Sequence, residues 1–165
     1  MEIRLLSQQD AEAYLTIRLL GLQNTPDSFA SSYNEEKEQT ATKYESRFQS
    51  RDSYTFGAFE NNQLVGVVTL VTERLMKLKH RASIVSMYVS PDKRGIGIGK
   101  NLILAAIKKA RDLKSVEQIN LSVVTTNESA KNLYYSLGFK VFGIERKALK
   151  LGNTYWDEEH MVLFI

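Results

Sequence analysis

A glycine-rich junction between a strand-like run and a helix-like run constrains the fold of this chain more than any other segment. Residues 82–89 are typical of a strand, and residues 98–114 repeat apolar side chains at helical spacing. Between them, Gly95, Gly97 and Gly99 stand at alternate positions, so the backbone can approach a ligand without Cβ atoms in the way. The first N–H groups of a helix lack partners within it, and together with the helix dipole they attract anions. The junction therefore predicts a strand–turn–helix unit whose turn binds an anionic ligand.

The spacing around the glycines narrows the kind of anion. Arg94 and Lys100 add positive charge on both sides, which favours a pyrophosphate. A Walker loop is excluded, because Arg94 occupies its first glycine position and Asn101 replaces its Ser or Thr. A Rossmann fingerprint is excluded because Lys100 stands where the last glycine belongs, and no acidic residue ends the next strand-like run, 119–124. What remains is either a turn without a ligand or the pattern Arg/Gln-x-x-Gly-x-Gly/Ala, formed by Arg94-Gly95-Ile96-Gly97-Ile98-Gly99.

Composition places the chain among ordinary globular proteins. Its 165 residues are 43% hydrophobic and 25% charged, which fits one domain over residues 1–165. No apolar run approaches the ~20 residues that cross a bilayer, and the first residues lack the pattern of a signal peptide. We therefore expect no membrane partner. The absence of cysteine excludes disulfides and thiol catalysis and fits a cytoplasmic location.

The charged residues argue against two further classes of function. The net charge is only +3, and the one dense basic run, 77–81, reads as a connection between strands rather than as a nucleic-acid surface. The chain has two histidines, His80 and His160, far apart in the sequence. This spacing argues against a metal site.

Apolar periodicity and turn residues predict the order β-α-α-β-β-β-α-β-α-β-β. Ser7, with Asp10 three residues later, caps the first helix, and Asn61-Asn62 and Gly152-Asn153 are turns of two hairpins. Mixed order with crossover helices implies an α/β sheet with both antiparallel and parallel pairs. The predicted elements are strands over 3–6, 54–60, 63–73, 82–89, 119–124, 141–151 and 155–164, and helices over 8–22, 34–50, 98–114 and 127–137.

A second motif lies downstream of the glycine turn. It reads Asn-x-x-Ala-x-x-Leu-Tyr-x-x-x-Gly-Phe, from Asn127 to Phe139. The two motifs, at their mutual spacing, resemble the GNAT (Gcn5-related N-acetyltransferase) superfamily. The resemblance is strongest over 82–139 and weaker over the first 50 residues. It implies the GNAT acyl-CoA N-acyltransferase fold, an α/β fold with a mixed central sheet of about seven strands and about four helices, as one domain.

The resemblance also implies acetyl-CoA as co-substrate, and no metal. The main chain of Met87, Tyr88 and Val89 would bind the pantetheine arm, and one N–H there would polarise the thioester carbonyl. The amide of Asn127 would contact the pantetheine or the nearby backbone. The pyrophosphate would lie on Arg94, Gly95, Ile96, Gly97, Ile98, Gly99 and Lys100.

Asn127 also has a purely structural interpretation. Asparagine is a good N-cap for the helix that follows it, and Thr125 with Glu128 offers a competing capping box. One amide has both donors and an acceptor, so Asn127 can cap the helix and contact a ligand at once.

Tyr134 likewise has two interpretations. Ala130, Leu133, Tyr134 and Leu137 share one helical face, so Tyr134 points inward and Tyr135 is rotated away. Such a tyrosine can simply pack in the core with its hydroxyl bonded to a neighbour. The resemblance implies instead that Tyr134 donates a proton to the departing CoA thiolate. A phenol with a reference pKa of about 10 is protonated at neutral pH and can act as an acid.

One feature of many family members is missing. They place a glutamate on the strand before the glycine turn as general base, but residues 83–89 contain no carboxylate. Candidate substitutes are Glu73, Asp157, Glu158, Glu159 and His160, and also Glu35 and Glu36 near the second helix. Each of these also reads as a surface or substrate-contact residue, and ordered water could take the proton instead. No base is assigned.

We therefore expect an N-acetyltransferase in which a primary amine of a small molecule, amino-acid-like or polyamine-like, attacks acetyl-CoA directly. A covalent acyl-enzyme is not expected, because cysteine is absent and the sequence suggests no serine–histidine pair. The run 152–161 is similar to the ending of some bacterial small-molecule and amino-acid acetyltransferases. The alternatives are a peptide or protein N-terminal acetyltransferase and an acyl-CoA-binding module without turnover. Exposed edges of the hairpin 141–164 also predict a homodimer.

Overall fold

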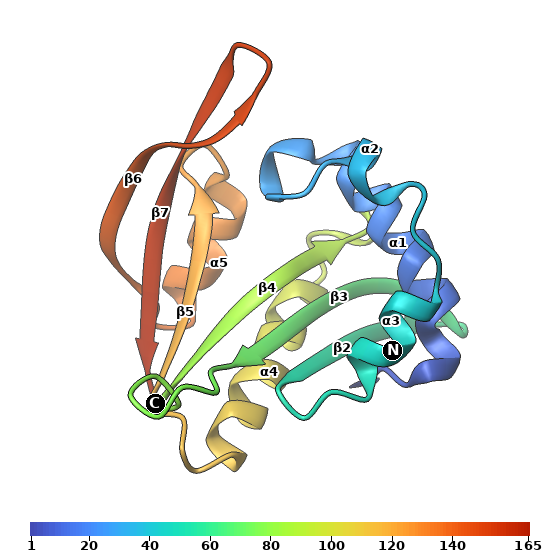
Figure 1. Ribbon diagram of the computed structural model, residues 1–165, viewed down its shortest axis with the longest axis horizontal. Helices are drawn as coiled ribbons and strands as arrows, with labels where there is room; N and C mark the ends of the chain where they lie inside the picture. Colours follow the sequence, from blue (N-terminus) through green and yellow to red (C-terminus); the bar gives the residue numbers. More distant parts are fainter.

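A computed structural model describes all residues 1–165, and its centre is one seven-stranded sheet (Figure 1). The strands lie in the order β1-β2-β3-β4-β5-β7-β6, and only β4 and β5 are parallel neighbours. Their bounds are β1 Glu2–Leu5, β2 Ser53–Glu60, β3 Gln63–Thr72, β4 Arg81–Val89, β5 Gln118–Val124, β6 Lys140–Leu151 and β7 Thr154–Phe164. The predicted mixed α/β sheet is confirmed, with strand ends shifted by one residue at most.

Five α-helices connect these strands. The N-terminal cap is close to the prediction, because the Asp10 carboxylate accepts from the N–H of Ser7 at 2.7 Å and from its hydroxyl at 3.0 Å. The cap precedes a short 3-10 turn, after which the first helix begins. The bounds are α1 Ala11–Asn24, α2 Tyr33–Glu36, α3 Thr42–Phe48, α4 Ile98–Asp112 and α5 Glu128–Ser136.

The predicted single helix over 34–50 is wrong, because the structure has α2 and α3 in its place. The hydroxyl of Tyr44 on α3 donates to Glu36 Oε2 on α2 at 2.8 Å. In one continuous helix these residues would stand about 12 Å apart along the axis, too far for that contact. Arg18 of α1 also bonds to Glu36. The chain therefore breaks between the helices so that both side chains can reach this carboxylate.

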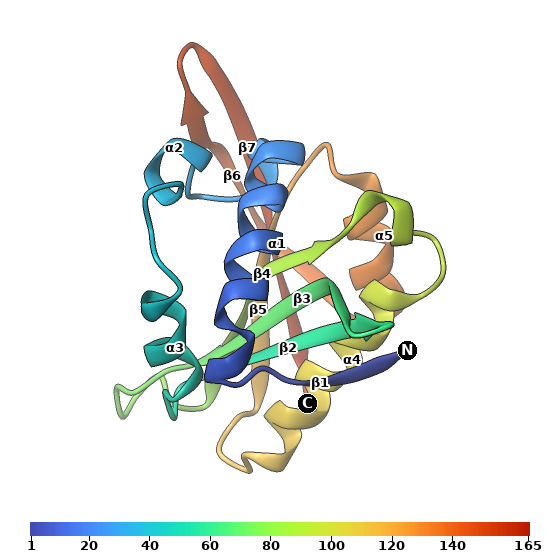
Figure 2. The same cartoon turned by 90° about the vertical axis from the view of Figure 1, so that its right-hand side faces the viewer.

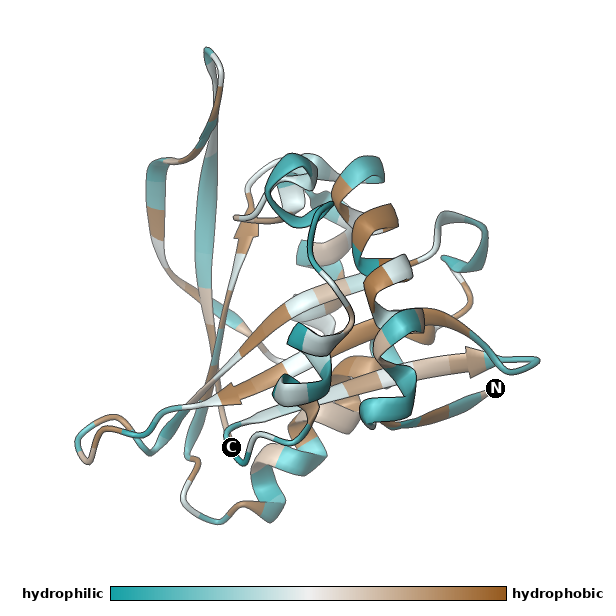
Figure 3. Ribbon diagram, turned by 45° about the vertical axis from the view of Figure 1, so that its right-hand side comes forward, coloured by the Kyte–Doolittle hydropathy of each residue, from teal (hydrophilic) through white to brown (hydrophobic).

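Helices cover both faces of the sheet (Figures 1 and 2). Helix α4 packs against β2, β3 and β4 on one face, and α1 with α3 packs on the other. Each face has its own core, the larger one around Leu102 and Ile103 and the smaller around Tyr14 and Tyr44. In Figure 3 the central strands are largely hydrophobic, whereas the β6–β7 hairpin is more hydrophilic and extends beyond the body. None of the helices combines the length and the apolar character needed to cross a membrane.

Strands β4 and β5 separate along their length, and this separation positions the site. They pair only at Arg81, Ala82 and Ser83 of β4. Further along, β4 carries a bulge against β3 at Ser86, whose φ of 54° lies in the left-handed region. The second half of β4 therefore has no neighbour on its β5 side.

Candidate active site

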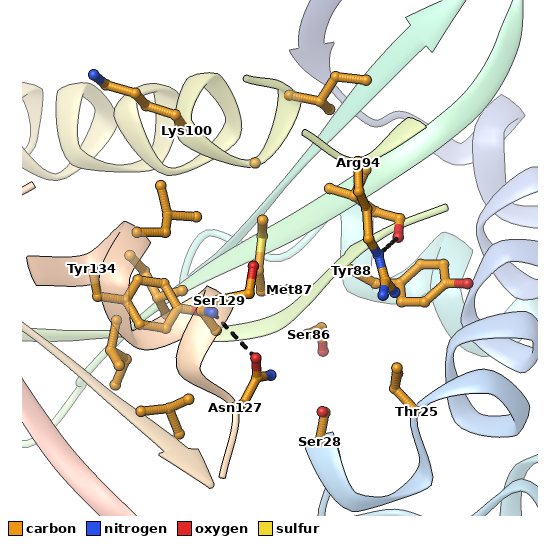
Figure 4. A pocket seen from close by; sticks show the side chains of 18 of the residues that line it. Thr25, Ser28, Ser86, Met87, Tyr88, Arg94, Lys100, Asn127, Ser129 and Tyr134 are labelled. Carbon is orange, nitrogen blue, oxygen red and sulfur yellow. Dashed lines mark hydrogen bonds between the residues drawn. The ribbon is translucent and has the colours of Figure 1, made fainter. Parts of the chain in front are cut away.

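The separated strands border a cleft of about 370 Å³ (Figure 4). It is lined by the second half of β4, the glycine turn with the start of α4, the end of β5 and the start of α5. Thr25 and Ser28, which follow α1, close one side. All the predicted site residues line this cleft except Ile96, whose side chain is 62% exposed.

The glycine turn presents a row of unpaired N–H groups. Gly95 and Gly97 have φ angles of 80° and 88°, which L side chains rarely adopt. A Cβ at either position would meet nothing within 4 Å, so backbone conformation rather than space requires glycine. Gly97 is the N-cap of α4, and the N–H groups from Gly95 to Lys100 have no hydrogen-bond partner within the chain. With the positive end of the α4 dipole behind them, these donors suit an anion of two linked phosphates.

The third glycine allows three elements to meet. A Cβ at Gly99 would lie 3.1 Å from Cε of Met87 and 3.3 Å from Cδ2 of Leu133. These distances are tighter than most real Cβ contacts. Glycine at this position therefore lets α4 approach β4 and α5 closely, which joins the anion turn to the two elements that border the rest of the cleft.

The cationic side chains near the turn differ in their orientation. Arg94 folds back, and its Nε donates to the carbonyl of Val89 at 2.9 Å. Lys93, which the sequence did not single out, lines the cleft but pairs with Glu60. Lys100 is exposed and points away from the other labelled side chains in Figure 4. The main chain of the turn, more than its side chains, thus forms the centre of the anion site.

Strand β4 borders the cleft from Ile84 to Val89. Tyr88 and Val89 are buried, and the Tyr88 hydroxyl accepts from Nδ2 of Asn24 at 3.1 Å. Beyond Ser83 the main chain lacks a strand on its β5 side. Unpaired strand groups of this kind can bind amide groups of a ligand as an added strand would.

Asn127 is the N-cap of α5. Its Oδ1 accepts from the N–H of Ala130 at 3.1 Å. The competing capping box of Thr125 and Glu128 is therefore wrong. Because capping uses only the oxygen, the Asn127 amide nitrogen makes no hydrogen bond within the chain and remains free at the cleft.

We predict that Asn127→Ala lowers the free energy of unfolding by about 1 kcal/mol, the usual cost of losing an N-cap. Asn127→Asp, which keeps the capping oxygen but removes the amide donor, should retain that stability. Urea unfolding of the three proteins measures the difference. If Asn127→Ala is as stable as the parent, the capping bond contributes nothing.

Tyr134 points into the cleft with a free hydroxyl. The residue is only 6% exposed, and its ring centroid lies 5.9 Å from that of Phe139. Its hydroxyl has no hydrogen-bond partner in the chain, whereas Tyr135, rotated away as predicted, donates to Glu159 at 3.2 Å. Burial raises the pKa of Tyr134 to about 12. The phenol is therefore protonated at neutral pH and can donate to a ligand.

Most of the candidate bases are engaged elsewhere. Four have partners: Glu35 with Ser32, Glu36 with Arg18 and Tyr44, Asp157 with the N–H of Lys147, and Glu159 with Lys131 and Tyr135.

Glu158 is the one carboxylate that lines the cleft, and Glu73 does not line it. Burial raises the pKa of Glu158, and Glu145 adds to the rise while His160 opposes it. No group of three His, Cys, Asp or Glu side chains is arranged to hold a metal ion.

The structure contains a serine–histidine pair that the sequence did not suggest. The β5–β7 register sets Ser122 opposite His160, and Ser122 Oγ lies 2.8 Å from His160 Nδ1. On the other side of the ring, Nε2 lies 3.0 Å from Oε2 of Glu145 on β6. Sequence reasoning missed this contact because the three residues belong to three strands whose order in the sheet is not local information. The only signal in the sequence was the alternation along β5, which places Ser122 on the opposite face of the strand from Leu121 and Val123.

The chain is similar to known acetyltransferases. A family model described as an acetyltransferase (GNAT) domain matches residues 3–160. An N-alpha-acetyltransferase from Sulfurisphaera tokodaii is 35% identical over 91 residues, a match that covers 55% of this chain and about half (51%) of that protein. A spermidine N(1)-acetyltransferase from Thermoplasma acidophilum is 26% identical over 152 residues, 86% of this chain and 89% of that protein. The structure of yncA, a putative acetyltransferase from Salmonella typhimurium with its cofactor acetyl-CoA, has a TM-score of 0.87 at 20% identity and covers 99% of this chain and 93% of that one.

Proposed function

Because this chain belongs to the GNAT acetyltransferase family, we propose that it transfers an acetyl group from acetyl-CoA to a primary amine of a small molecule. One observation carries the proposal: the unpaired N–H groups from Gly95 to Lys100 and the free hydroxyl of Tyr134 lie in the same cleft. The domain extent of 1–165, the cytoplasmic location and the homodimer remain predictions.

The cleft residues fit acetyl-CoA, which supplies the reactive thioester. The N–H groups of the turn would bind its diphosphate, with Arg94 and Lys100 adding long-range attraction. The unpaired main chain of β4, from Met87 to Val89, would bind the pantetheine amides. One N–H there would stabilise the negative charge that develops on the thioester oxygen. The free amide nitrogen of Asn127 is a further donor for the pantetheine.

Tyr134 is the proposed acid. With a pKa of about 12 for Tyr134, full proton transfer to a thiolate with a reference pKa of about 8.5 would be uphill by about 5 kcal/mol. Burial also raises the proton affinity of a thiolate expelled into the cleft, which narrows this gap. The hydroxyl therefore donates a hydrogen bond as charge develops on sulfur, and the proton moves as the C–S bond breaks.

A small ammonium-bearing acceptor is favoured by Glu158, the one carboxylate in the cleft, which would attract the cation. The related spermidine N(1)-acetyltransferase is consistent with a polyamine-like acceptor. The second candidate is the N-terminal amine of a peptide or protein, supported by the likeness to an N-alpha-acetyltransferase. A third candidate, an acyl-CoA-binding module without turnover, follows from the lack of a carboxylate on β4.

Two measurements on the purified protein separate these candidates. Calorimetry measures acetyl-CoA binding, and thiol release is then followed with spermidine, amino acids and peptides with free N-termini. Turnover of spermidine or an amino acid supports the proposal, and turnover confined to peptides identifies an N-terminal acetyltransferase. Tight binding without thiol release from any amine identifies a binding module. Absence of binding contradicts all three.

A further inference from the structure

We propose that Ser122, His160 and Glu145 form a proton relay that takes a proton from the acceptor ammonium and carries it out of the cleft. The relay rests on the proposed acetyl transfer, for which it supplies the base that β4 lacks. The three residues lie on β5, β7 and β6, which are adjacent in the sheet. Nothing in the glycine turn or in α5 contributes to it.

Ser122 is the end of the relay inside the cleft. The parallel pairing of β4 with β5 stops at Ser83 and Asn120, two residues before Ser122. Side chains alternate along a strand, so Ser122 stands on the same face as Asn120, just where the strands separate. Its side chain is exposed and lines the cleft, as Val85 does from β4. An acceptor amine entering between the strands would therefore meet this hydroxyl.

The hydrogen bonds of the imidazole determine which way protons can move. A carboxylate only accepts, so the bond to Glu145 places a proton on Nε2 of His160. In the neutral ring, Nδ1 is then an acceptor, and the hydroxyl of Ser122 donates to it. The lone pairs of Ser122 Oγ remain available to accept from an ammonium. A base oriented by a third group in this way is the arrangement used in acid–base triads.

The groups around His160 are acidic, and they lead toward solvent. The charged groups that face His160 are Glu145 on β6 and Glu158 on its own strand, both acidic, while β5 contributes only Ser122. The side chain of His160 is 29% exposed, and that of Glu145, on the outer strand, is 58% exposed. A proton taken up in the cleft can therefore leave at the outer strand.

The proposed step balances as follows. An ammonium N–H bond breaks and its proton binds Ser122 Oγ, while the Ser122 O–H bond breaks and that proton binds Nδ1 of His160. The electron pair freed on nitrogen forms the C–N bond, and the C–S bond breaks with its pair on sulfur. Tyr134 donates its proton to the sulfur to give the CoA thiol, and the second proton lost by the nitrogen restores the Tyr134 hydroxyl. The proton gained at Nδ1 of His160 is matched by the Nε2 proton, which passes to Glu145 and then to water, so each turnover releases one proton. In this scheme Ser122 contacts the acceptor, whereas His160 and Glu145 act through it.

The hydrogen-bond state of His160 can be measured without any acceptor. Long-range ¹⁵N–¹H NMR of the imidazoles, assigned with His160→Gln, reports which nitrogen carries the proton at a pH where the ring is neutral. The relay requires the Nε2–H tautomer. The Nδ1–H tautomer would overturn it, because Nδ1 could not then accept from Ser122. This result does not depend on whether the proposed acetyl transfer is correct.

The kinetic test uses the acceptor with the highest turnover among spermidine, amino acids and peptides. We expect His160→Gln and Ser122→Ala to lower kcat/KM at pH 7 by about 100-fold or more, the range for losing a general base. The loss should shrink as the pH approaches about 10, where an amine of ordinary pKa is neutral without help. His80→Gln is the matched control, since His80 is the only other histidine and its side chain makes no hydrogen bond.

Several results would overturn the relay. A loss of the same size at every pH, in variants that remain folded, would show a structural role only. Activity within about threefold of the parent at pH 7 would show that neither residue handles the proton. An acetyl group found on Ser122 by mass spectrometry during turnover would make that residue a nucleophile instead. If no amine is turned over, the proposed function fails, and the NMR tautomer still decides whether the relay geometry exists.

Discussion

Glu36→Ala should lower the free energy of unfolding by about 3–5 kcal/mol, the usual cost of breaking a buried ion pair. Glu36 joins α1, α2 and α3, because its carboxylate accepts from Arg18 at 2.8 and 3.1 Å and from Tyr44 at 2.8 Å. The side chains of Arg18 and Glu36 are only 11% and 9% exposed. Removing the carboxylate leaves a buried guanidinium and a buried hydroxyl without partners. Urea unfolding of the variant and the parent measures the loss.

A double variant and a pH series provide the controls. Arg18→Met with Glu36→Leu removes both charges and should recover part of this loss, because only the Tyr44 hydroxyl then lacks its partner. Burial alone would raise the pKa of Glu36, but hydrogen bonds from Arg18 and Tyr44 outweigh it and lower the pKa to about 2. The pair therefore stabilises the parent fully above about pH 4.5 and loses this contribution as the pH falls toward 2. Equal stability of Glu36→Ala and the parent at pH 7 would contradict this account.

The same network connects the fold to the side of the cleft that Thr25 and Ser28 form. The Arg18 guanidinium carbon lies 4.8 Å from the ring centroid of Phe29, and its Nη2 reaches the hydroxyl of Ser31 at 3.4 Å. These residues continue the segment that contributes Thr25 and Ser28 to the cleft. The buried ion pair thus fixes the position of a wall of the site, although none of its members lines the cleft.

Tyr134→Phe should lower kcat by at least about tenfold, which corresponds to about 1.4 kcal/mol of lost transition-state stabilisation. The phenol hydroxyl has no partner in the protein, so its removal deprives only the leaving sulfur of a donor. For the same reason, stability should change by less than about 0.5 kcal/mol, within the range of substitutions that break no contact. Steady-state thiol release at saturating acetyl-CoA, together with urea unfolding, measures both quantities.

Tyr135→Phe is the matched control for this prediction. Tyr135 is the next residue on the same helix, but its hydroxyl donates to Glu159 and it does not line the cleft. Its loss should leave kcat unchanged. An unchanged kcat in Tyr134→Phe would remove the acid role, and the free hydroxyl would then be a packing feature only. A large loss of stability in Tyr134→Phe would show that the hydroxyl has a structural partner.

The parts of the site that depend on local chemistry could be predicted from the sequence. A glycine-rich strand–turn–helix junction has glycines with positive φ and backbone N–H groups without partners wherever it lies in the sheet. The roles of Gly95 and Gly97 in the turn could therefore be predicted without a structure. The inward face of Tyr134 follows from helical spacing alone. Their presence in one cleft could not be derived from spacing, and the resemblance to a family supplied that expectation.

The parts that depend on contacts between distant segments could not be predicted in this way. The break between α2 and α3 exists because Arg18 and Tyr44 both bond to Glu36, and the apolar edge of a helix contains no signal for it. The contacts of His160 with Ser122 and Glu145 require β7 to lie between β5 and β6 in the sheet. This spatial order of the strands cannot be read from their order along the chain. The hydrogen bond from Arg94 Nε to the carbonyl of Val89, at the end of β4, was likewise not visible in the sequence.

The central claim is that main-chain N–H groups of the glycine turn bind the diphosphate of coenzyme A. A crystal structure of the protein with acetyl-CoA tests it most directly. We predict diphosphate oxygens about 2.7–3.2 Å from several of the backbone nitrogens between Gly95 and Lys100. A diphosphate bound elsewhere on the protein, or no acetyl-CoA at saturating concentration, would contradict the account.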